Sequence, residues 1–518
     1  MAVLYTAQTF SWLRRHYGFR LFFLVLLFLR PTIPAGNQGT EADVKPNILF
    51  ILAEDHSAQL GVYGDNYVST PNIDQLAEQG VRFDNAYVTQ AGCSPSRASI
   101  LTGLYPHQHG QIGLATHKMR LFDDDIPNMP AILKEHGYRT GNIGKIHVTP
   151  ESVFRFDYQN NASYNRFGNR DISAVANESE AFIVSGEEPF YLQVNFADAH
   201  LPFLSQEFGI PDKPYVTDQI GTLPFVGLRT DLALQQTADY YSCMARLDRA
   251  VEMLLDVLER TGMIQNTLVI YMSDHGAEVP RGKMTSFEGG IHVPLIMWMP
   301  GHIDAGMVRK ELVSTIDLMP TILALAGAEI PDGLPGRSLL PLLRNEHVHW
   351  REYLFTEFTL HWPETFFPQR TVRYERFKLI HNLLPDTINP VYQHYMTMNR
   401  GWKAGEDPYE GLPEHKRRAY EQWKHPVSYE LYDLKNDRWE WNNLAEMPEY
   451  QDVFSRLRDE LEKWQTESGD ELRHRDKLMR LEQEVRSTFI DGEYIHLRNR
   501  PDFEWQYVEY LRPHRITP

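Results

Sequence analysis

Cysteine is scarce in this sequence, with only Cys93 and Cys243 among its 518 residues. Small secreted folds held together by disulfides need many more, so that class is excluded and stability must come from a packed core. An excess of positive charge is also missing, because 51 Lys and Arg face 69 Asp and Glu and leave a formal net charge of −18. This balance argues against a nucleic-acid-binding protein, since contact with phosphates requires a basic surface. An anionic substrate would have to meet a local pocket of positive charge.

Long apolar runs are lacking too, and the segment Leu21–Leu29 falls short of the about 20 residues that span a membrane. It follows a basic stretch and precedes a proline and small residues, which is the pattern of a secretory signal peptide. We expect an exported protein, with a signal peptide over residues 1–36 that is cleaved near Ala35 and a polar linker over 37–45. Basic residues on both flanks of the apolar run leave an uncleaved interfacial anchor as the alternative.

The remaining chain alternates apolar segments with helical patterns. Six β-branched and apolar segments are typical of strands, namely Asn47–Ala53, Val81–Val88, Thr140–Gly144, Phe190–Phe196, Leu268–Met272 and Val293–Met299. Apolar residues at helical spacing over 240–258 predict a long amphipathic helix. Together these patterns predict a large, mainly parallel α/β sheet flanked by helices over residues 46–346. Aromatic, proline-punctuated sequence then predicts a smaller C-terminal α+β domain over 347–470, followed by a charged extension over 471–518.

Polar residues follow four of the predicted strands at the point where each strand ends. They are Glu54 and Asp55, Lys145 and His147, Asp198 and His200, and Asp274 and His275. One such residue alone is more often a helix cap or a surface charge, but ligands of open α/β sheets bind beyond the carboxyl ends of the strands. Four coincidences at one edge therefore favour an active site. Its carboxylates could hold a hard divalent cation such as calcium, for which His275 is a less natural ligand.

A cysteine motif adds a candidate nucleophile to this edge. Cys93 opens the segment CSPSRASILTG, between a strand-like and a helix-like stretch, where backbone N–H groups and Arg97 would stabilise an anion. Cys243 lies within the predicted amphipathic helix and is expected to be a buried core residue. The order cysteine, any residue, proline, serine, arginine, followed by Thr102 and Gly103, resembles the hallmark of the type I sulfatase family. The resemblance extends from about Lys45 to Glu446, through SDHG, STIDLMPTILALAG and LPGRSLLPLL.

This resemblance implies an alkaline-phosphatase-like sulfatase fold and a formylglycine nucleophile that a formylglycine-generating enzyme makes from Cys93. It also implies one calcium ion with five ligands, namely Glu54, Asp55, Asp274, His275 and an oxygen of the modified Cys93. Two of these positions depart from the usual pattern, because relatives commonly have aspartate in place of Glu54 and asparagine in place of His275. Arg97 matches the residue that holds the formylglycine. The sulfate-binding and proton-transfer set is matched by Lys145, His147, His200 and Lys283.

The implied mechanism follows from where charge develops. The metal, the two lysines and Arg97 would neutralise the oxygens of the sulfate while a hydroxyl of the hydrated aldehyde attacks sulfur. His200 would protonate the leaving oxygen or nitrogen. His147 would help to deprotonate the second hydroxyl, so that inorganic sulfate leaves and the aldehyde is restored.

Three stretches resemble the heparan N-sulfatase, or sulfamidase, branch of the family, namely CSPSRASILTGLYPHQHGQIGL, TGNIGKIHVTPESVFRFDY and RFKLIHNL. That branch cleaves the N-linked sulfate of terminal glucosamine, so the expected substrate is a sulfated saccharide that carries N-sulfoglucosamine. Two enzymatic alternatives stay open: an O-sulfatase for another sulfated glycan or an aryl sulfate, and a phosphonate monoester or phosphodiester hydrolase of the same superfamily. A non-catalytic, glycan-binding pseudo-sulfatase is disfavoured because the nucleophile, metal, lysine and histidine positions are all filled.

Residues outside this set are candidates for contact with the sugar or a uronate carboxylate. They are His107, His109, His117, Asp198, His361 and Arg370. The aromatic patch HWPETFF over 361–367 is either a sugar-stacking wall or an interface between the two domains. The expected partners are thus the saccharide and the maturation enzyme, with no nucleic acid. Because relatives are often dimers, a homodimer stays open.

Overall fold

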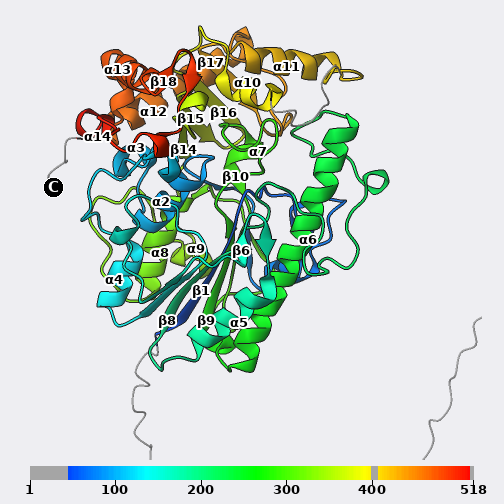
Figure 1. The fold of residues 1–518 in the computed structure, drawn as a ribbon, viewed down its shortest axis with the longest axis vertical. Coiled ribbons are helices and arrows are strands. Elements are labelled where there is room, and N and C mark those ends of the chain that lie inside the picture. The colour runs from blue at the N-terminus through cyan, green and yellow to red at the C-terminus, as the bar shows by residue number, and fades with distance from the viewer. Residues whose placement is uncertain (1–44, 398–406, 514–518) are drawn as a thin grey trace, which may run out of the picture. The chain divides into compact units, whose positions relative to one another are not determined.

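An eight-stranded sheet forms the centre of the fold (Figure 1). In order across the sheet, its strands are β12 (Met307–Arg309), β2 (Val81–Phe83), β11 (Leu295–Trp298), β9 (Thr267–Ser273), β1 (Asn47–Ala53), β8 (Phe190–Asn195), β4 (Arg139–Ile143) and β5 (Tyr158–Asn160). Only β11 runs antiparallel to its neighbours, so the predicted mainly parallel α/β sheet is confirmed. The structure, a computed structural model, describes residues 45–397 and 407–513. The predicted signal peptide, and all of the predicted linker except Lys45, lie outside these residues.

Two predicted strands are each divided in two. The segment 81–88 forms β2 and β3 (Ala86–Tyr87), which belong to different sheets, because the turn-forming pair Asp84 and Asn85 separates them. The segment 293–299 forms β10 (His292–Val293) and β11, with Pro294 between them. Proline has no N–H to donate to a sheet, so it ends one strand before the other begins. The short strand β3 pairs with both β10 and β13 (Val313–Ser314) in a separate three-stranded sheet.

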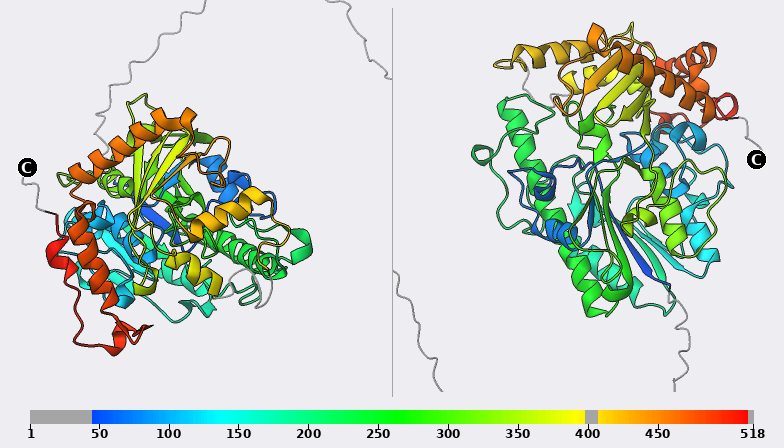
Figure 2. Two further views of the ribbon diagram at one scale, coloured as in Figure 1. Left: turned by 90° about the horizontal axis from the view of Figure 1, so that it is seen from above. Right: turned by 180° about the vertical axis from the view of Figure 1, so that it is seen from behind.

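Both faces of the central sheet are covered, because alternate residues of β1 point to opposite cores. Leu49, Ile51 and Ala53 belong to a core with residues of α1 (Pro71–Gln79), α5 (Ile172–Ile183) and α6 (Asp231–Arg260). Ile48, Phe50 and Leu52 belong to a second core with α2 (Cys93–Thr102), α4 (Met129–Glu135), α8 (Leu318–Leu325) and α9 (Leu340–Leu343). The two sets of helices flank the sheet in Figures 1 and 2. Every β1 residue is buried, which explains its continuous apolar sequence.

The predicted amphipathic helix is α6, which is 30 residues long and buries Cys243 among its core residues. Its buried positions recur at helical spacing and face the sheet, while its other face carries charged residues. Among the described residues, no helix combines the length and the apolar character needed to cross a membrane.

A four-stranded antiparallel sheet lies over the carboxyl edge of the central sheet (Figures 1 and 2). Its strands are β14 (Tyr353–Phe358), β15 (Gln369–Tyr374), β16 (Phe377–Asn382) and β17 (Tyr429–Asp433), and the helix α12 (Gln451–Glu467) packs on it. Leu457, Leu461 and Trp464 of α12 share a core with Val372 and Leu379 of the sheet. The predicted smaller C-terminal α+β part is therefore present, and its sheet is antiparallel.

The charged C-terminal sequence packs against the α/β part of the protein that contains the central sheet. It forms α13 (Arg475–Arg486), the hairpin β18 (Phe489–Ile490) and β19 (Glu493–Tyr494), and α14 (Tyr507–Tyr510). Trp505 and Tyr507 share a core with Ile112 and Met119, more than 380 residues earlier in the chain. The charged residues lie outside while the apolar ones pack inward, so this segment is part of the folded body.

Gly144 joins β4 to the candidate site residue Lys145 and tests how tightly this edge is built. Its φ is +93°, and a Cβ there would lie 2.4 Å from the carbonyl oxygen of Asn195. We expect Gly144→Ala to lower the free energy of unfolding by about 1–2 kcal/mol from backbone strain and by about 1–3 kcal/mol more from overpacking. Denaturant unfolding measures this change.

Gly137→Ala is the matched control, because Gly137 has a φ of +82° but no atom within 4 Å of the added Cβ. It should show the strain alone. Equal losses in the two variants would contradict the close approach of Gly144 to Asn195.

Candidate active site

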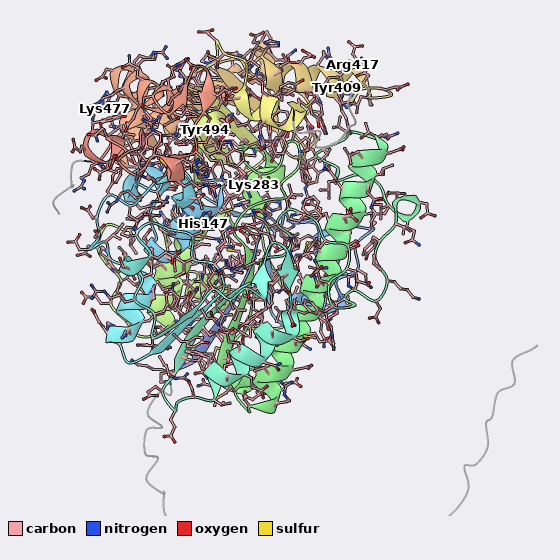
Figure 3. All side chains as sticks on the ribbon, in the orientation of Figure 1. His147, Lys283, Tyr409, Arg417, Lys477 and Tyr494 are labelled. Atoms are coloured by element: carbon pink, nitrogen blue, oxygen red, sulfur yellow. The ribbon has the colours of Figure 1, made fainter. Side chains whose placement is uncertain are left out.

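The four predicted strand ends meet at one edge of the sheet. The strands β9, β1, β8 and β4 are consecutive neighbours and parallel, so the residues that follow them emerge side by side. Figure 3 shows His147 and Lys283 between this edge and the C-terminal sheet. Asp198 is the exception among the predicted residues, because its side chain turns away into a buried ion pair that is described below.

Three buried carboxylates form the centre of the cluster. Glu54, Asp55 and Asp274 are at most 1% exposed, and Asp55 adopts a left-handed backbone conformation with a φ of +53°. The backbone N–H of Asp55 donates to Oδ1 of Asp274 at 3.1 Å, which joins the ends of β1 and β9. Ligand atoms of Asp55, Asp274, Cys93 and His275 all lie within 4.8 Å of one another.

Each of these carboxylates is paired with a cation. Lys145 Nζ contacts Glu54 Oε1, and Lys283 Nζ lies 2.9 Å from Asp55 Oδ2. The third pair joins Arg97 Nε to Asp274 Oδ2 at 2.9 Å. These six side chains come from four segments, namely the ends of β1 and β4, helix α2, and the segment between β9 and α7. The pairs place two lysines and one arginine around the carboxylate centre.

The donor chemistry of this centre fits a hard divalent cation. Burial raises the pKa of Asp55 to about 7, and repulsion from the neighbouring carboxylates Glu278 and Asp274 adds to this effect. Lys283 and His275 act in the opposite direction. A divalent cation among the carboxylate oxygens would relieve that repulsion. His275 Nε2 faces the same space, 3.3 Å from Asp55 Oδ1 and 3.3 Å from Cys93 Sγ. The residues matched to the metal ligands are thus brought together.

Cys93 begins helix α2, which has every residue buried. Gly92 precedes it in extended conformation, and Ser96 donates to the carbonyl oxygen of Asp274 at 2.5 Å, which fixes the start of the helix against β9. Burial raises the pKa of the Cys93 thiol to about 12, so the unmodified side chain is a weak nucleophile. Arg97, one turn along α2, donates from Nη1 to Asn195 Oδ1 at 2.9 Å.

Two histidines flank the cysteine with different surroundings. His147 is half-buried and has a φ of +61°. Both of its ring nitrogens are buried and have no hydrogen-bond partner among the described residues. Its pKa is held well below the usual value by burial and by the charge of Lys145. His200 contacts the carbonyl oxygen of Leu201 through Nδ1 at 2.6 Å, and burial followed by Lys283 lowers its pKa to about 4. Both rings are therefore neutral without an anion in the site.

These groups line a cavity of about 570 Å³. The predicted residues on its wall are Glu54, Cys93, His117, Lys145, His147, His200, Lys283 and His361. Lys145 and Lys283 are the ammonium groups that an anion would meet there, beside four histidines whose pKa values are lowered by burial. The volume is in the range of small-molecule sites and admits a sugar residue with its sulfate.

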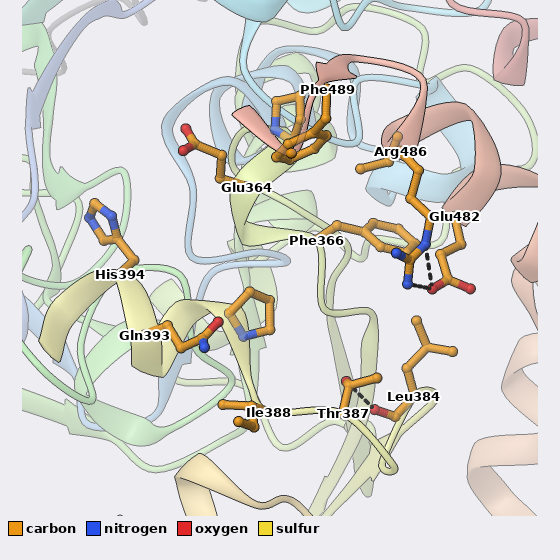
Figure 4. Close-up of a pocket in the computed structure, with 14 residues that line it drawn as sticks. Glu364, Phe366, Leu384, Thr387, Ile388, Gln393, His394, Glu482, Arg486 and Phe489 are labelled. Atoms are coloured by element: carbon orange, nitrogen blue, oxygen red, sulfur yellow. Dashed lines mark hydrogen bonds and ion pairs between the residues drawn. The ribbon is translucent and has the colours of Figure 1, made fainter. Parts of the chain in front are cut away.

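The aromatic patch divides between this cavity and a neighbouring one. His361 and Trp362 line the catalytic cavity, and their rings lie 4.9 Å apart between centroids. Figure 4 shows the neighbouring cavity of about 680 Å³, which includes Glu364 and Phe366. The patch therefore contributes side chains to the walls of two cavities, and its stacking on a sugar stays a prediction.

The polar residues of this second cavity do not converge on one point. Arg486 and Glu482 pair with each other at 2.7 Å on one side of it (Figure 4). Thr387 donates to the carbonyl oxygen of Leu384 at 3.1 Å on the other side. Reactive groups of complementary kinds gather instead in the catalytic cavity.

Residues of the C-terminal extension support the catalytic cavity from behind, which the sequence did not reveal. His117 Nδ1 hydrogen-bonds to the hydroxyl of Tyr494 at 2.5 Å, and its ring lies 4.5 Å from that of His496. Trp505 Nε1 donates to the carbonyl oxygen of His117 at 2.9 Å. These contacts hold one wall of the cavity with residues about 380 positions away, which no local pattern can indicate.

Other wall residues were also missed. Phe167 stacks on His200 with 3.9 Å between ring centroids and lies 5.3 Å from Lys145 Nζ. It belongs to the irregular segment between β6 (Asn165–Arg166) and β7 (Asn169–Arg170), which has no periodic signal. Asn195 could have been found, because it is the last residue of β8 at the same edge.

Asp198 and Arg370 are corrected from substrate contacts to structural residues. Asp198 is buried between Arg170 and Arg246, at 2.5 and 2.6 Å, and does not line the catalytic cavity. Arg370 is fully buried, and its guanidinium meets both carboxylate oxygens of Asp470 at 2.7 and 2.8 Å. Their charges are already matched within the protein, so neither is offered to a sugar.

Two of the candidate histidines are corrected in the same way. His107 Nδ1 lies 3.0 Å from Glu357 Oε1, and His109 Nε2 lies 3.1 Å from Ser99 Oγ. Both rings are buried outside the catalytic cavity. Their order in the sequence resembled a polar loop, whereas they pack beside α2 and β14.

Two models of known protein families match this chain. The sulfatase family model matches residues 46–328, and the model described as N-sulphoglucosamine sulphohydrolase, C-terminal, matches residues 282–396. The first match covers more than half of the chain, so the protein belongs to the sulfatase family and is a hydrolase of that family. The resemblance inferred from the cysteine motif is confirmed. The family implies a metal and a formylglycine, and the buried cluster of carboxylates around Cys93 is where the sequence motifs place them.

Two curated relatives match over most of this chain. N-sulphoglucosamine sulphohydrolase from Homo sapiens is 33% identical over 458 residues, covering 82% of this chain and 90% of that protein. An ulvan-active sulfatase from Formosa agariphila is 31% identical over 438 residues, covering 82% of this chain and 81% of that protein. Among solved structures, the phosphonate monoester hydrolase of Agrobacterium radiobacter has the same fold, with a TM-score of 0.63 at 21% identity over 82% of this chain and 96% of that one.

The buried ion pairs of Arg370 with Asp470 and Glu357 are costly to break. We expect Arg370→Met to lower the free energy of unfolding by about 3–5 kcal/mol, because it leaves Asp470 and Glu357 buried without their cation. The KM of the folded fraction should stay within about twofold. Denaturant unfolding and steady-state kinetics on one preparation measure both quantities.

Arg376→Met is the matched control, since Arg376 pairs with Asp433 but is 40% exposed in its side chain. It should cost at most about 1 kcal/mol. A large rise in KM for Arg370→Met with unchanged stability would restore the substrate contact.

Proposed function

We propose that this protein hydrolyses the sulfamate of N-sulfoglucosamine in a sulfated saccharide, by way of a formylglycine made from Cys93. The observation that carries the proposal is which segment of the chain forms part of the cavity wall. Lys283, His361 and Trp362 all lie within residues 282–396, the part matched by the C-terminal model of N-sulphoglucosamine sulphohydrolase. The segment that supplies this side of the cavity is thus matched by a model named for that enzyme. The human enzyme of that name matches over 82% of this chain.

Positive charge prepares the cavity for the sulfate group. Lys145 and Lys283 both line it, and each already contacts a carboxylate of the centre. An entering sulfamate would share these ammonium groups, which withdraw charge from the sulfate oxygens as sulfur is attacked. Arg97 keeps Nη2 without a hydrogen-bond partner among the described residues, and its other nitrogens orient Asp274 and Asn195.

The histidines handle protons on the two sides of the reaction. His200 holds a proton on Nδ1 through the carbonyl oxygen of Leu201, so Nε2 is the nitrogen that exchanges a proton with the leaving amine. A bound anion favours the charged imidazolium and so equips it to donate. His147 faces the same cavity with both nitrogens uncommitted among the described residues, and is assigned to accept the proton when sulfate is released.

A metal ion and the formylglycine would complete this arrangement. Glu54, Asp55, Asp274 and His275 would hold a calcium ion, and Cys93 would carry the formylglycine. When bound, the ion supplies positive charge beside the sulfate and the hydrated aldehyde supplies the attacking hydroxyl. The carboxylates fix the position of the ion, while α2 fixes the position of the nucleophile. We further propose that the protein reaches a secretory compartment through its N-terminal signal peptide.

Removal of the nucleophile tests the mechanism. We expect Cys93→Ala, produced together with a formylglycine-generating enzyme, to lower kcat at least about 1,000-fold. Initial rates of sulfate release measure the loss. The fold should persist, because alanine fits the first turn of α2.

Cys243→Ala is the matched control, since Cys243 is the other buried cysteine and lies in α6, away from the cavity. Its kcat should stay within about threefold. Unchanged activity in Cys93→Ala would sink the formylglycine mechanism, and with it both enzymatic alternatives that use the motif.

A panel of substrates tests the specificity. Free sulfate should be released from N-sulfoglucosamine at least about tenfold faster, by kcat/KM, than from 6-O-sulfated N-acetylglucosamine or a sulfated phenol. Sulfate release only from an O-sulfated compound would replace the proposed substrate while keeping the mechanism. Hydrolysis of a phosphonate monoester in preference to all three would favour the phosphonate hydrolase instead.

A further inference from the structure

A third cavity, separate from the catalytic one and from that of Figure 4, lies beside the start of α6, α11 (Glu414–Lys424) and the loop after β17. Its volume is about 840 Å³. Three cations line it, and each comes from a different segment: Arg229 directly before the cap of α6, Lys416 on α11, and Arg438 after β17. We call this cavity, with Tyr67, Trp439 and Trp441 as its aromatic wall, the cation–aromatic groove. None of its lining residues has a role in the catalytic cavity.

The three cations lack carboxylate partners. In the described part of the chain, no carboxylate lies within ion-pair distance of Arg229, Lys416 or Arg438, although acidic residues outnumber basic ones overall. Burial and the positive charges of Arg229 and Arg281 lower the pKa of Lys416. The carboxylate of Asp437 offsets part of this effect on the pKa of Lys416. The groove therefore gathers positive charge that ion pairs among the described residues do not neutralise, and an anion would relieve the remaining repulsion.

The acidic residue of the groove is already engaged. Among the described residues that line it, Asp65 is the only carboxylate. Its Oδ2 accepts from the hydroxyl of Tyr241 at 2.7 Å, and its Oδ1 accepts from the N–H of Tyr67 at 2.8 Å. Asp65 thus shapes the loop that presents Tyr67, while the three cations face the groove.

Aromatic faces alternate with these cations. Lys416 Nζ lies 4.6 Å from the ring centroid of Trp441, and the guanidinium of Arg438 lies 4.9 Å from that of Trp439. Tyr67 on the opposite loop is 50% exposed. Apolar faces of sugar rings pack on aromatic side chains, while sulfate and carboxylate groups pair with guanidinium and ammonium groups. An anionic oligosaccharide presents both features along one chain.

The aromatic wall is held rigidly. The guanidinium of Arg281 lies between Phe287 and Trp441, at 4.1 and 4.4 Å from the ring centroids. It also donates to the carbonyl oxygens of Trp439 and Glu440, at 2.8 and 2.9 Å. A preformed wall loses little conformational freedom when a ligand binds.

We propose that the cation–aromatic groove binds a sulfated stretch of an oligosaccharide at a distance from the hydrolysed group. The choice of sulfated saccharide rests on the proposed function, whereas the existence of an anion-binding groove rests on its own residues. The groove holds chain segments that the catalytic cavity of about 570 Å³ does not accommodate. It raises the affinity for long substrates without touching the reacting bond.

Binding is measured first on the full-length Cys93→Ala protein, so that no hydrolysis occurs. Isothermal titration with a heparan-type sulfated octasaccharide should give saturable binding, and Arg229→Ala/Arg438→Ala should weaken it at least about tenfold. The control Arg344→Ala/Arg418→Ala removes the same charge from exposed positions outside the groove and should change the affinity less than about twofold. Equal affinity in the two double variants would overturn the proposal.

A second titration tests the class of ligand. A linear polyphosphate of equal charge should bind at least about tenfold more weakly than the octasaccharide, because it has no ring faces to pack on the aromatic wall. Equal binding of both ligands, lost equally in the groove variant, would overturn the saccharide assignment. These titrations keep their meaning even if N-sulfoglucosamine proves not to be the substrate, since they do not depend on turnover.

Kinetics of the active enzyme link the groove to the substrate. Arg229→Ala/Arg438→Ala should raise the KM for the octasaccharide about tenfold and leave kcat unchanged. Both constants for free N-sulfoglucosamine should match those of the parent enzyme. An equal change for the monosaccharide would show damage to the catalytic cavity and contradict a separate site.

Discussion

The pairing of buried carboxylates with buried cations at the edge of the sheet is the constraint on which the centre depends. Glu54, Asp55 and Asp274 each contact one cation, and Glu278 also lies 3.2 Å from Lys283. Four carboxylates against three cations leave the centre slightly negative. A divalent ion bound by these carboxylates would make the net charge of the centre positive. That positive charge would then attract a sulfate. In a protein with a net charge of −18, this local reversal makes an anionic substrate acceptable.

Such a concentration of buried charge requires a rigid support, which the second layer provides. Asp198 follows β8 and is fixed by two arginines, two residues before His200. Gly144 follows β4 and allows its backbone to approach that of Asn195. Buried ion pairs are weak sources of stability but are costly to break. Their value here is positional, because each one fixes a loop that presents a reactive side chain.

The sequence allowed the site to be predicted wherever the signal was local. Glu54 and His275 follow continuous apolar strands, and the topology of a parallel sheet brings strand ends together without further information. Residues set by distant partners could not be placed in this way. Arg370 resembled a free cation because Asp470, which binds it, lies 100 positions away. Tyr494 supports the cavity from a segment that shows only charge and short apolar spacing.

Local chemistry also explains the errors in the predicted strands. Val81–Val88 and Val293–Met299 have the apolar content of single strands, but a turn pair divides the first and Pro294 the second. The first break moves the chain from the central sheet to the small three-stranded sheet, and the second moves it from that small sheet back to the central one. Apolar content predicts burial reliably, whereas the sheet to which a residue belongs depends on single turn residues.

An acidic surface also determines how a polyanionic chain can be held. Charges farther apart than about 8 Å are largely screened at physiological ionic strength, so the overall repulsion is weak and affinity depends on close contacts. The catalytic cavity gathers its cations around carboxylates and needs a metal before its charge becomes positive. The cation–aromatic groove presents three cations that form no ion pair with a carboxylate in the described part of the chain. Binding a long chain first through Arg229 and Arg438 would therefore not depend on the metal, whereas cleavage would, which separates substrate capture from catalysis in one protein.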